Sequence, residues 1–421
     1  MPLLVAVCLL TFLHYVGAQM RGPILPLYAA AYGATATGVG FIVAAHMAVA
    51  AAGSIPLGRA SDVWGRRPLL LGGMLVSAVT SLLLPFFEGE VALMTIYGLA
   101  GVGVAAFTPS ALSLVGDGAA PGRAGHAFAW YTTAHYGAIA VGPFLGGLAA
   151  QWGGYREAFV GSAIVVAGAL VFGWAMPAPA APAGIPRQGA RFADIRGNVD
   201  VWAGWAVSVG GLTTQGVVFT FFPLLAHERG LMPATIGLVF LVLGLANTLA
   251  RFPAGWLVDR TGRCTPYAVG GVLVASVVTA FLPSAPGQMA LLALAAVFGA
   301  VSGTAGVATG VALAGAAPPA SRGVVMGGYS TALYLGLALG SFALGPVITR
   351  HGYSAGFSVG GAAGAVGALI AGLLWATGAH WRRTVVTPGP PLLRSSGSSA
   401  LRSHERLPET EREPGRDNKG D

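Results

Sequence analysis

The stretch Gly58-Arg-Ala-Ser-Asp62-Val-Trp-Gly65-Arg66-Arg67 joins two long apolar runs of the chain. A related stretch, Gly255-Trp-Leu-Val-Asp259-Arg260-Thr-Gly262-Arg263, joins two later apolar runs. The two copies are offset by 197 residues, because 259 − 62 = 197 and 263 − 66 = 197. The spacing therefore predicts an internal repeat that makes up most of the chain.

The repeat extends on both sides of these loops. The offset of 197 also pairs Pro26 with Pro223, Gly40 with Gly237 and Pro56 with Pro253. Further along, an offset of 198 pairs Tyr131 with Tyr329, Tyr136 with Tyr334 and Gly142 with Gly340. If each copy holds six helices, both enter the membrane from the same side, and the halves are related by an axis along the membrane normal.

The composition predicts an all-α polytopic membrane protein. Of the 421 residues, 55% are hydrophobic and only 9% are charged, whereas about a quarter of a soluble domain is charged. Apolar runs of roughly 20 residues, the length that crosses a bilayer, recur along the chain. The 65 glycines suit helices that pack closely in lipid.

Twelve transmembrane helices are expected, as two pseudo-symmetric six-helix bundles. The predicted spans are 3–22, 36–57, 68–86, 91–115, 127–151, 157–176, 201–226, 234–257, 266–283, 287–314, 323–349 and 354–380. The predicted domains are an N-terminal bundle (1–176), a linker (177–200), a C-terminal bundle (201–380) and a disordered polar tail (381–421). The first residues are interpreted as a retained helix, because they lack a basic leader and a small-residue cleavage site.

Arginine placement predicts the orientation. Ten arginines fall in the loops of one side: Arg59, Arg66, Arg67, Arg123, Arg187, Arg191, Arg196, Arg260, Arg263 and Arg322. Three fall on the other side: Arg156, Arg229 and Arg350. Cytoplasmic loops retain Lys and Arg, so both termini are expected in the cytoplasm of a bacterial-type inner membrane.

Other functional classes are disfavoured. The net charge of +8 comes from scattered arginines at helix ends, which does not indicate nucleic-acid binding. No phosphate-cradling loop for ATP, no metal-ligand cluster and no nucleophile–base arrangement is visible, and Cys8 and Cys264 make no metal spacing. We expect no enzyme activity, no cofactor and no metal, and a monomer whose partners are the lipid bilayer and a small-molecule substrate.

The two loops resemble the signature loop of the major facilitator superfamily, glycine-x-x-x-aspartate-arginine-x-glycine-arginine-arginine. Val63 and Cys264 depart from that pattern. The resemblance implies that Asp62 latches the first half against the helix 323–349 when the cytoplasmic side is shut. A charged turn anchored in the headgroups is the alternative. The predicted gating residues are Gly58, Asp62, Gly65, Arg66, Arg67, Gly255, Asp259, Arg260, Gly262 and Arg263.

A second motif bears on direction. Gly142-Pro143-Phe-Leu-Gly146-Gly147, in the helix 127–151, resembles the glycine-proline-x-x-glycine-glycine motif of the superfamily's exporters, although Ala138 stands where the family has a further glycine. The resemblance implies efflux. Generic packing of small residues is the alternative.

The placement of the acidic residues gives little support for coupling of transport to protons. The arginine and glutamine that proton antiporters carry in the helix 91–115 are missing, and no Asp or Glu lies near the middle of an apolar run. His14 and His135 could carry protons, although a lone buried histidine is more often a packing residue. His46 is expected to face the outer gate.

Two arginines interrupt apolar runs. Arg251 is interpreted either as a contact for an anionic substrate or a charge partner between the halves, or as a side chain that snorkels to the headgroups. For Arg21 the outer interface is favoured. Further candidate cavity groups are Gln19, Tyr131, Gln215 and Asn247.

The sequence thus predicts a secondary transporter of a small organic molecule that works by alternating access, most simply an efflux permease, with proton coupling left open. An uncoupled facilitator or importer of a metabolite is the alternative within this class. A non-transporting membrane sensor is the alternative from another class. Such a sensor would carry an appended folded domain, for which the polar tail is too short.

Overall fold

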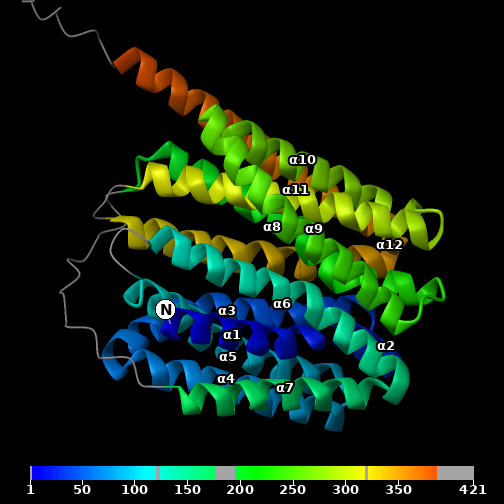
Figure 1. Ribbon diagram of the computed structural model, residues 1–421. Coiled ribbons are helices and arrows are strands. Elements are labelled where there is room, and N and C mark those ends of the chain that lie inside the picture. Colours follow the sequence, from blue (N-terminus) through cyan, green and yellow to red (C-terminus); the bar gives the residue numbers. More distant parts are fainter. Residues whose placement is uncertain (1, 120–123, 177–194, 318–320, 386–421) are drawn as a thin grey trace, which may run out of the picture. The chain divides into compact units, whose positions relative to one another are not determined.

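The computed structural model describes residues 2–119, 124–176, 195–317 and 321–385, and every regular element within these ranges is a helix (Figure 1). The first half contains α1 (Pro2–Met20), α2 (Ile24–Ala31), α3 (Ala36–Trp64), α4 (Arg66–Leu83), the 3-10 helix η1 (Leu84–Phe86), α5 (Glu90–Asp117), α6 (Ala124–Gly153) and α7 (Tyr155–Ala175). The second half contains α8 (Val199–Glu228), α9 (Pro233–Thr261), α10 (Thr265–Phe281), η3 (Leu282–Ser284), α11 (Gly287–Ala316) and α12 (Arg322–Val385).

Ten helical segments of the described residues are long and apolar enough to cross a membrane. One of them, Val324–Gly378, has 55 residues, far more than the roughly 20 that a single crossing needs. It is interrupted at Gly352, whose φ of 79° is not helical, at the break predicted between 349 and 354. The helix α6 is not among the ten, so the count of twelve stays a prediction.

The first predicted span ended too early. The helices α1 and α2 together form one apolar segment, Leu3–Ala31. Pro23, at the start of α2, has φ −76° and ψ −21°, values compatible with a helix. A proline is tolerated in the first turn of a helix, so Gly22-Pro23 bends the chain there and does not end the crossing.

The helices on either side of the two related loops are separated by glycines in left-handed backbone conformations. Gly65 has φ 95° between α3 and α4. Gly262 has φ 63° and ends α9, with its N–H donating to Val258 O at 2.9 Å. The two glycines are related by the repeat (262 − 65 = 197). Positive φ is accessible to glycine at little cost, which explains why both loops carry it at this point.

Packing within and between the halves follows the repeat. In the first half α3 packs against α5, and α1 packs against α6 and α7; in the second half α9 packs against α11. Between the halves, α6 lies along α9 (Figure 1). The α9–α11 contact depends on small residues, because a Cβ on Gly299 or Gly303 would collide with the backbone of α9. Such contacts account for the abundance of glycine.

The predicted domain boundaries are only partly covered by the description. The described residues up to Gly378 form one compact unit. α7 ends at Ala175 and α8 begins at Val199, while the linker residues 177–194 lie outside the described residues. The predicted tail was placed to begin at residue 381, but α12 continues to Val385; residues 386–421 lie outside the description.

Candidate functional site

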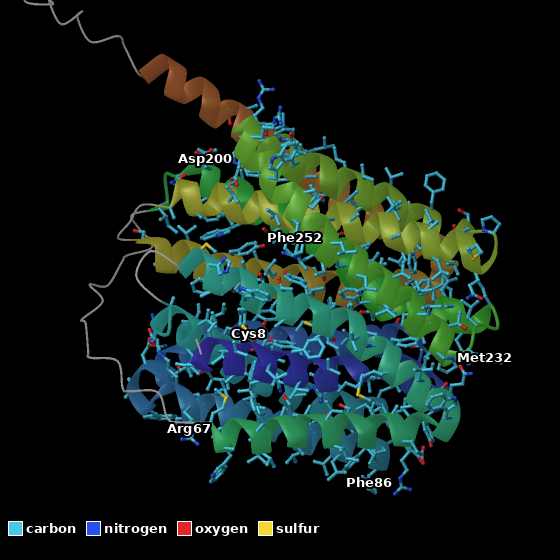
Figure 2. All side chains as sticks on the ribbon, in the orientation of Figure 1. Cys8, Arg67, Phe86, Asp200, Met232 and Phe252 are labelled. Carbon is cyan, nitrogen blue, oxygen red and sulfur yellow. The ribbon has the colours of Figure 1, made fainter. Side chains whose placement is uncertain are left out.

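The first signature loop ties together helices of the first half. Arg66 is 6% exposed and pairs with two carboxylates, Asp62 near the end of α3 at 3.4 Å and Asp117 at the end of α5. The next residue, Arg67, donates to the carbonyl oxygen of Trp174 in α7. The Arg66 pairs hold α3, α4 and α5 together at the arginine-rich end of the molecule, where Figure 2 labels Arg67. The predicted latch between Asp62 and the helix 323–349 stays a prediction.

The second signature loop has the same glycine turn as the first, but its charged side chains lie at the surface. Asp259, Arg260 and Arg263 are exposed. The Arg260 guanidinium lies 5.1 Å from the ring centre of Trp256, one turn earlier. The two loops therefore share a backbone design, while the network around Arg66 belongs to the first half.

The exporter-like motif of α6 packs against α1 on one side. A Cβ on Gly142 would lie 2.7 Å from the oxygen of Val16 and from the Cβ of Gln19. A Cβ on Gly146 would collide with the backbone of Met20. Gln19, predicted as a cavity group, thus lies at the α1–α6 contact.

The same motif packs against α9 on its other side. A Cβ on Gly147 would collide with the carbonyl group of Pro233, at the start of α9. The carbonyl oxygen of Pro143 lies 2.7 Å from the Cβ position of Gly237 in α9, and Gly244 likewise abuts the backbone of α6. This motif therefore allows backbone-to-backbone contact between the two halves.

An equivalent contact joins α3 to α12. A Cβ on Gly40 would collide with the backbone oxygen of Ser341, and one on Gly345 would lie 2.9 Å from Thr37 Cα. The hydroxyl groups of Thr37 and Thr349 are 2.9 Å apart. Both interhalf contacts lie at the end of the molecule opposite the arginine-rich loops, on the side where Figure 2 labels Met232.

The two contacts are related residue by residue. The contact between Gly147 and Pro233 has a repeat-related equivalent in the contact between Gly345 and Ala36. The paired residues are offset by 198 and 197 positions (345 − 147 = 198 and 233 − 36 = 197). In the same way, the contact between Gly237 and Pro143 is equivalent to the contact between Gly40 and Ser341, with offsets of 197 and 198 positions (237 − 40 = 197 and 341 − 143 = 198). The pseudo-twofold relation inferred from the sequence offsets is therefore present in the contacts that close this end.

Towards the arginine-rich end, two glycines on the same helix faces have open space at their Cβ positions. Gly255 of α9 follows Gly244 by eleven residues (255 − 244 = 11), which at 100° per residue returns to nearly the same face. Nothing in the described part of the chain lies within 4 Å of its Cβ position. The same holds for Gly327 of α12, which precedes Gly345 by eighteen residues (345 − 327 = 18). The two halves thus touch at one end, while at the arginine-rich end the Cβ positions of Gly255 and Gly327 face open space; we call this the diverging end.

A small cavity lies between the halves, where α6, α8, α9 and α11 meet. Its volume is about 40 Å³, enough for a water molecule. Its lining is mostly apolar, from Ile139, Phe219, Leu243 and Phe298. Polar groups come from Tyr136, Gln215, Asn247 and Ser302. Two predicted cavity residues, Gln215 and Asn247, therefore share one site.

Arg251 extends from α9 to the first half. Its Nε–H donates to Asn247 Oδ1 at 3.1 Å, and its Cζ lies 3.4 Å from the centre of the Tyr136 ring in α6. The snorkelling alternative is thus wrong, because the guanidinium stacks on a residue of the opposite half. This stacking links the second half to the first beside the cavity.

Arg21 is not at the outer interface, and that expectation is wrong. Its side chain is 1% exposed and donates to Ser81 Oγ at 2.7 Å and to Ser77 O at 3.3 Å in α4. Its Cζ lies 5.5 Å from the ring centre of Tyr97. Small hydroxyl-bearing residues leave room for the guanidinium inside the first half, so it stays there and does not extend towards the headgroups.

The candidate histidines form an aromatic group with residues of the first half. His14 is fully buried and stacks on Phe107 with ring centres 4.0 Å apart. His135 packs edge-on against Tyr15, whose hydroxyl lies 2.6 Å from Thr108 Oγ1. By contrast, His46 places Nδ1 2.9 Å from Tyr97 O and stacks on that ring, as a packing residue does.

Several polar atoms of this group are buried without a hydrogen-bond partner among the described residues. They are both ring nitrogens of His14, Nδ1 of His135 and the hydroxyl of Tyr131. Buried polar atoms are usually satisfied, so such a cluster calls for a specific explanation, of which bound water is one. Both candidate proton carriers and the candidate Tyr131 therefore lie in one group.

Sequence reasoning missed four tyrosines of this region. Tyr15 and Tyr136 lie beside His135. Tyr334 is within electrostatic range of Tyr15 and Tyr136, and Tyr329 is within range of Arg251. The signal was available, because Tyr131 and Tyr136 are repeated as Tyr329 and Tyr334.

Comparison with known proteins agrees with this geometry. The model of the Major Facilitator Superfamily matches residues 7–341 and 212–404. An uncharacterized MFS-type transporter of Methanocaldococcus jannaschii is 20% identical over 83% of this chain and 93% of its own. The chloramphenicol resistance protein of Pseudomonas aeruginosa is 26% identical over 79% of each chain. The crystal structure of a mutant of the nucleoside transporter NupG superposes with a TM-score of 0.74 at 14% identity, covering 89% of this chain and 100% of that one.

Proposed function

Because the chain belongs to the Major Facilitator Superfamily, and is thus a transporter and not an enzyme, we propose that it exports a small organic molecule by alternating access. The proposal places both termini in the cytoplasm and the monomer in a bacterial-type inner membrane. The observation that carries the proposal is the pair of related glycine contacts that closes one end, while towards the other end the Cβ positions of Gly255 and Gly327 face open space.

The geometry suggests how access alternates. The cavity beside Arg251 lies between the closed end and the diverging end. A substrate enters from the arginine-rich end, and the halves then rock about the site. Separation of α6 from α9 and of α3 from α12 exposes it to the outside. Closure at the arginine-rich end brings the faces around Gly255 and Gly327 together, with Asp62 proposed as the latch.

Two observations support efflux as the direction. The motif from Gly142 to Gly147 resembles that of exporters, and here it forms the contact between the halves. One relative that matches most of the chain bears the name of chloramphenicol resistance. An exporter must load from the cytoplasm, and the diverging end is the predicted cytoplasmic one.

Uncoupled transport is the second candidate. In the described helices every Asp and Glu lies in the first or last turn, so no carboxylate is placed to carry a proton through the membrane. The remaining candidate proton carriers are His14 and His135, which have buried ring nitrogens without a hydrogen-bond partner among the described residues. A proton antiporter of this design would work through these imidazoles.

The decisive experiment is transport by the purified chain in proteoliposomes, measured as counterflow over a chemical panel that includes chloramphenicol. Accumulation above protein-free vesicles for at least one compound is expected. If no compound moves although the protein is folded, the transport proposal fails and the sensor alternative gains.

Coupling of transport to protons is measured with a pH-sensitive dye inside the proteoliposomes during the same counterflow experiment. A substrate-dependent pH change that His135→Gln abolishes would establish the histidine route. Transport without any pH change would establish the uncoupled alternative.

A further inference from the structure

The geometry points to Arg251 as the anion-binding group of the central site, and to amphipathic organic monoanions as the substrate class. This inference rests on the proposed transport function and adds the chemistry of the transported molecule. It depends on three features: the free edge of the guanidinium, the lack of a compensating carboxylate, and the apolar lining of the adjacent cavity.

The guanidinium is held so that one edge stays available. Asn247 accepts from Nε, and the Tyr136 ring covers one face. Within the described residues neither terminal nitrogen of Arg251 makes a hydrogen bond. Nη2 lies 3.6 Å from the Cβ position of Gly306 in α11, so the absence of a side chain there leaves space. Two parallel N–H groups with a fixed orientation match a carboxylate bidentately.

The charge of Arg251 is not neutralised by the described part of the protein. Both ion pairs found there involve Arg66, at the arginine-rich end. The titratable groups near Arg251 include Tyr136, on which it stacks, and His135 and Tyr329, and none of the three is a carboxylate. A cation inside a membrane span is costly unless it is paired or functional. A bound anion would supply the missing charge.

The lining of the cavity, and not its present volume of about 40 Å³, indicates the rest of the ligand, because the ligand would contact these side chains once the halves move apart. Next to Asn247 its walls are the side chains of Ile139, Phe219, Leu243 and Phe298, which favour an apolar or aromatic body. Gln215 offers one amide for a neutral polar group. The other interior arginine, Arg21, is bonded to α4 in the first half, so a second anionic group would find no partner.

The repeat shows that the anion site is single. The first-half counterparts of Arg251 and Asn247 are Ser54 and Ala50 (251 − 197 = 54 and 247 − 197 = 50). Ser54 donates to its own helix, at Ala50 O. The two halves therefore differ in the residues that recognise charge at this site. They share the repeat-related glycine contacts that close the outer end.

The test measures binding to the purified full-length chain in detergent, by calorimetry, with acids and their neutral amides as matched probes. The pairs are benzoate with benzamide, cinnamate with cinnamamide, and octanoate with octanamide. We expect at least one acid to bind about tenfold or more tighter than its amide, because the carboxylate makes charge-assisted hydrogen bonds to the guanidinium that the neutral amide cannot make. Arg251→Gln should abolish this preference, and Arg251→Lys should retain part of it.

Arg156→Gln is the matched control, because Arg156 also lies over an aromatic ring, Phe86, but at the outer end of α7. It should keep the preference for acids. Thermal unfolding of each variant without ligand verifies that it is folded. Equal binding of acids and amides, binding of neither, or an acid preference that survives Arg251→Gln would overturn the anion site.

The two proposals fail separately. Acid binding that depends on Arg251, without counterflow of any compound, would refute transport and leave the anion site standing. Counterflow of neutral compounds only, unaffected by Arg251→Gln, would leave transport standing and refute the monoanion class.

Discussion

Two arginines inside the membrane-spanning helices have opposite environments. Arg21 is bonded to backbone and hydroxyl oxygens of α4 within one half. Arg251 lies across the boundary between halves and keeps its terminal nitrogens unbonded to the described groups. Buried hydrogen bonds that stay within one half serve folding, whereas free donors between halves are available to a ligand. The two residues should therefore respond differently to substitution.

Arg21→Ala is expected to destabilise the fold. It removes a fully buried side chain together with its hydrogen bonds to Ser81 Oγ and Ser77 O, and it opens a cavity beside Tyr97. We expect a loss of roughly 2–4 kcal/mol in the free energy of unfolding, measured by denaturant unfolding of the purified protein. Arg156→Ala, at the outer end of α7, should change it by less than about 0.5 kcal/mol. An unchanged unfolding midpoint for Arg21→Ala would contradict a structural role.

The sequence alone could not separate these two arginines. Both interrupt an apolar run near a helix end, and in helices rich in glycine and alanine every face is apolar, so the pattern does not show which face is buried. The role of Arg21 depends on Ser77, Thr80 and Ser81, more than fifty residues away. That of Arg251 depends on Tyr136, in the other half.

At the level of the helices, the ends were harder to predict than the crossings. The run 36–57 was placed correctly, but α3 continues to Trp64, because charged residues such as Asp62 can extend a helix beyond the apolar layer. The sharp ends are those with a glycine at positive φ, such as Gly65 and Gly262. Those positions are recognisable from sequence, since only glycine adopts that conformation readily.

Glycines on the facing helices predict opposite shifts of the conformational equilibrium. Gly147→Val collides with Pro233 while the outer end is closed and should favour its opening. Gly255→Val adds bulk where the arginine-rich end must close, and should favour the state described here. A collision costing about 1–3 kcal/mol changes the ratio of states by about fivefold to a hundredfold.

Alkylation of Thr349→Cys by a membrane-impermeant maleimide reports on these shifts, in a background with Cys8 and Cys264 replaced by alanine. Labelling should rise with Gly147→Val and fall with Gly255→Val. Gly168→Val, on an open face of α7, should leave it unchanged. Shifts in the same direction for the first two variants would rule out the assignment of the two ends.

For the whole molecule, the sequence repeat predicted features in addition to the fold. It paired residues that close the end opposite the arginine-rich loops, since Gly40 and Gly237 lie in equivalent contacts. It could not predict the state of the molecule, because the same glycines fit a closed or an open end. Nor could it find the anion site, where Arg251 has no counterpart in the first half.

A reversible disulfide tests whether opening of the outer end is required for transport. Thr37 and Thr349 have hydroxyls 2.9 Å apart across the halves, close enough for cysteines at both positions to form a disulfide after small adjustments. In the cysteine-free background, oxidation of Thr37→Cys/Thr349→Cys should abolish counterflow, and dithiothreitol should restore it. Each single variant should be insensitive to oxidation. Full activity of the cross-linked protein would exclude rocking at this end.

The isolated charge of Arg251 also has an electrical consequence. It is carried by a helix within the membrane field, in which one elementary charge is worth about 2.3 kcal/mol per 100 mV. When the carrier is empty, any displacement of this side chain along the field moves one positive charge. When a monoanion is bound, the pair moves no net charge. Membrane voltage then acts on the return of the empty carrier and leaves the loaded step electrically silent.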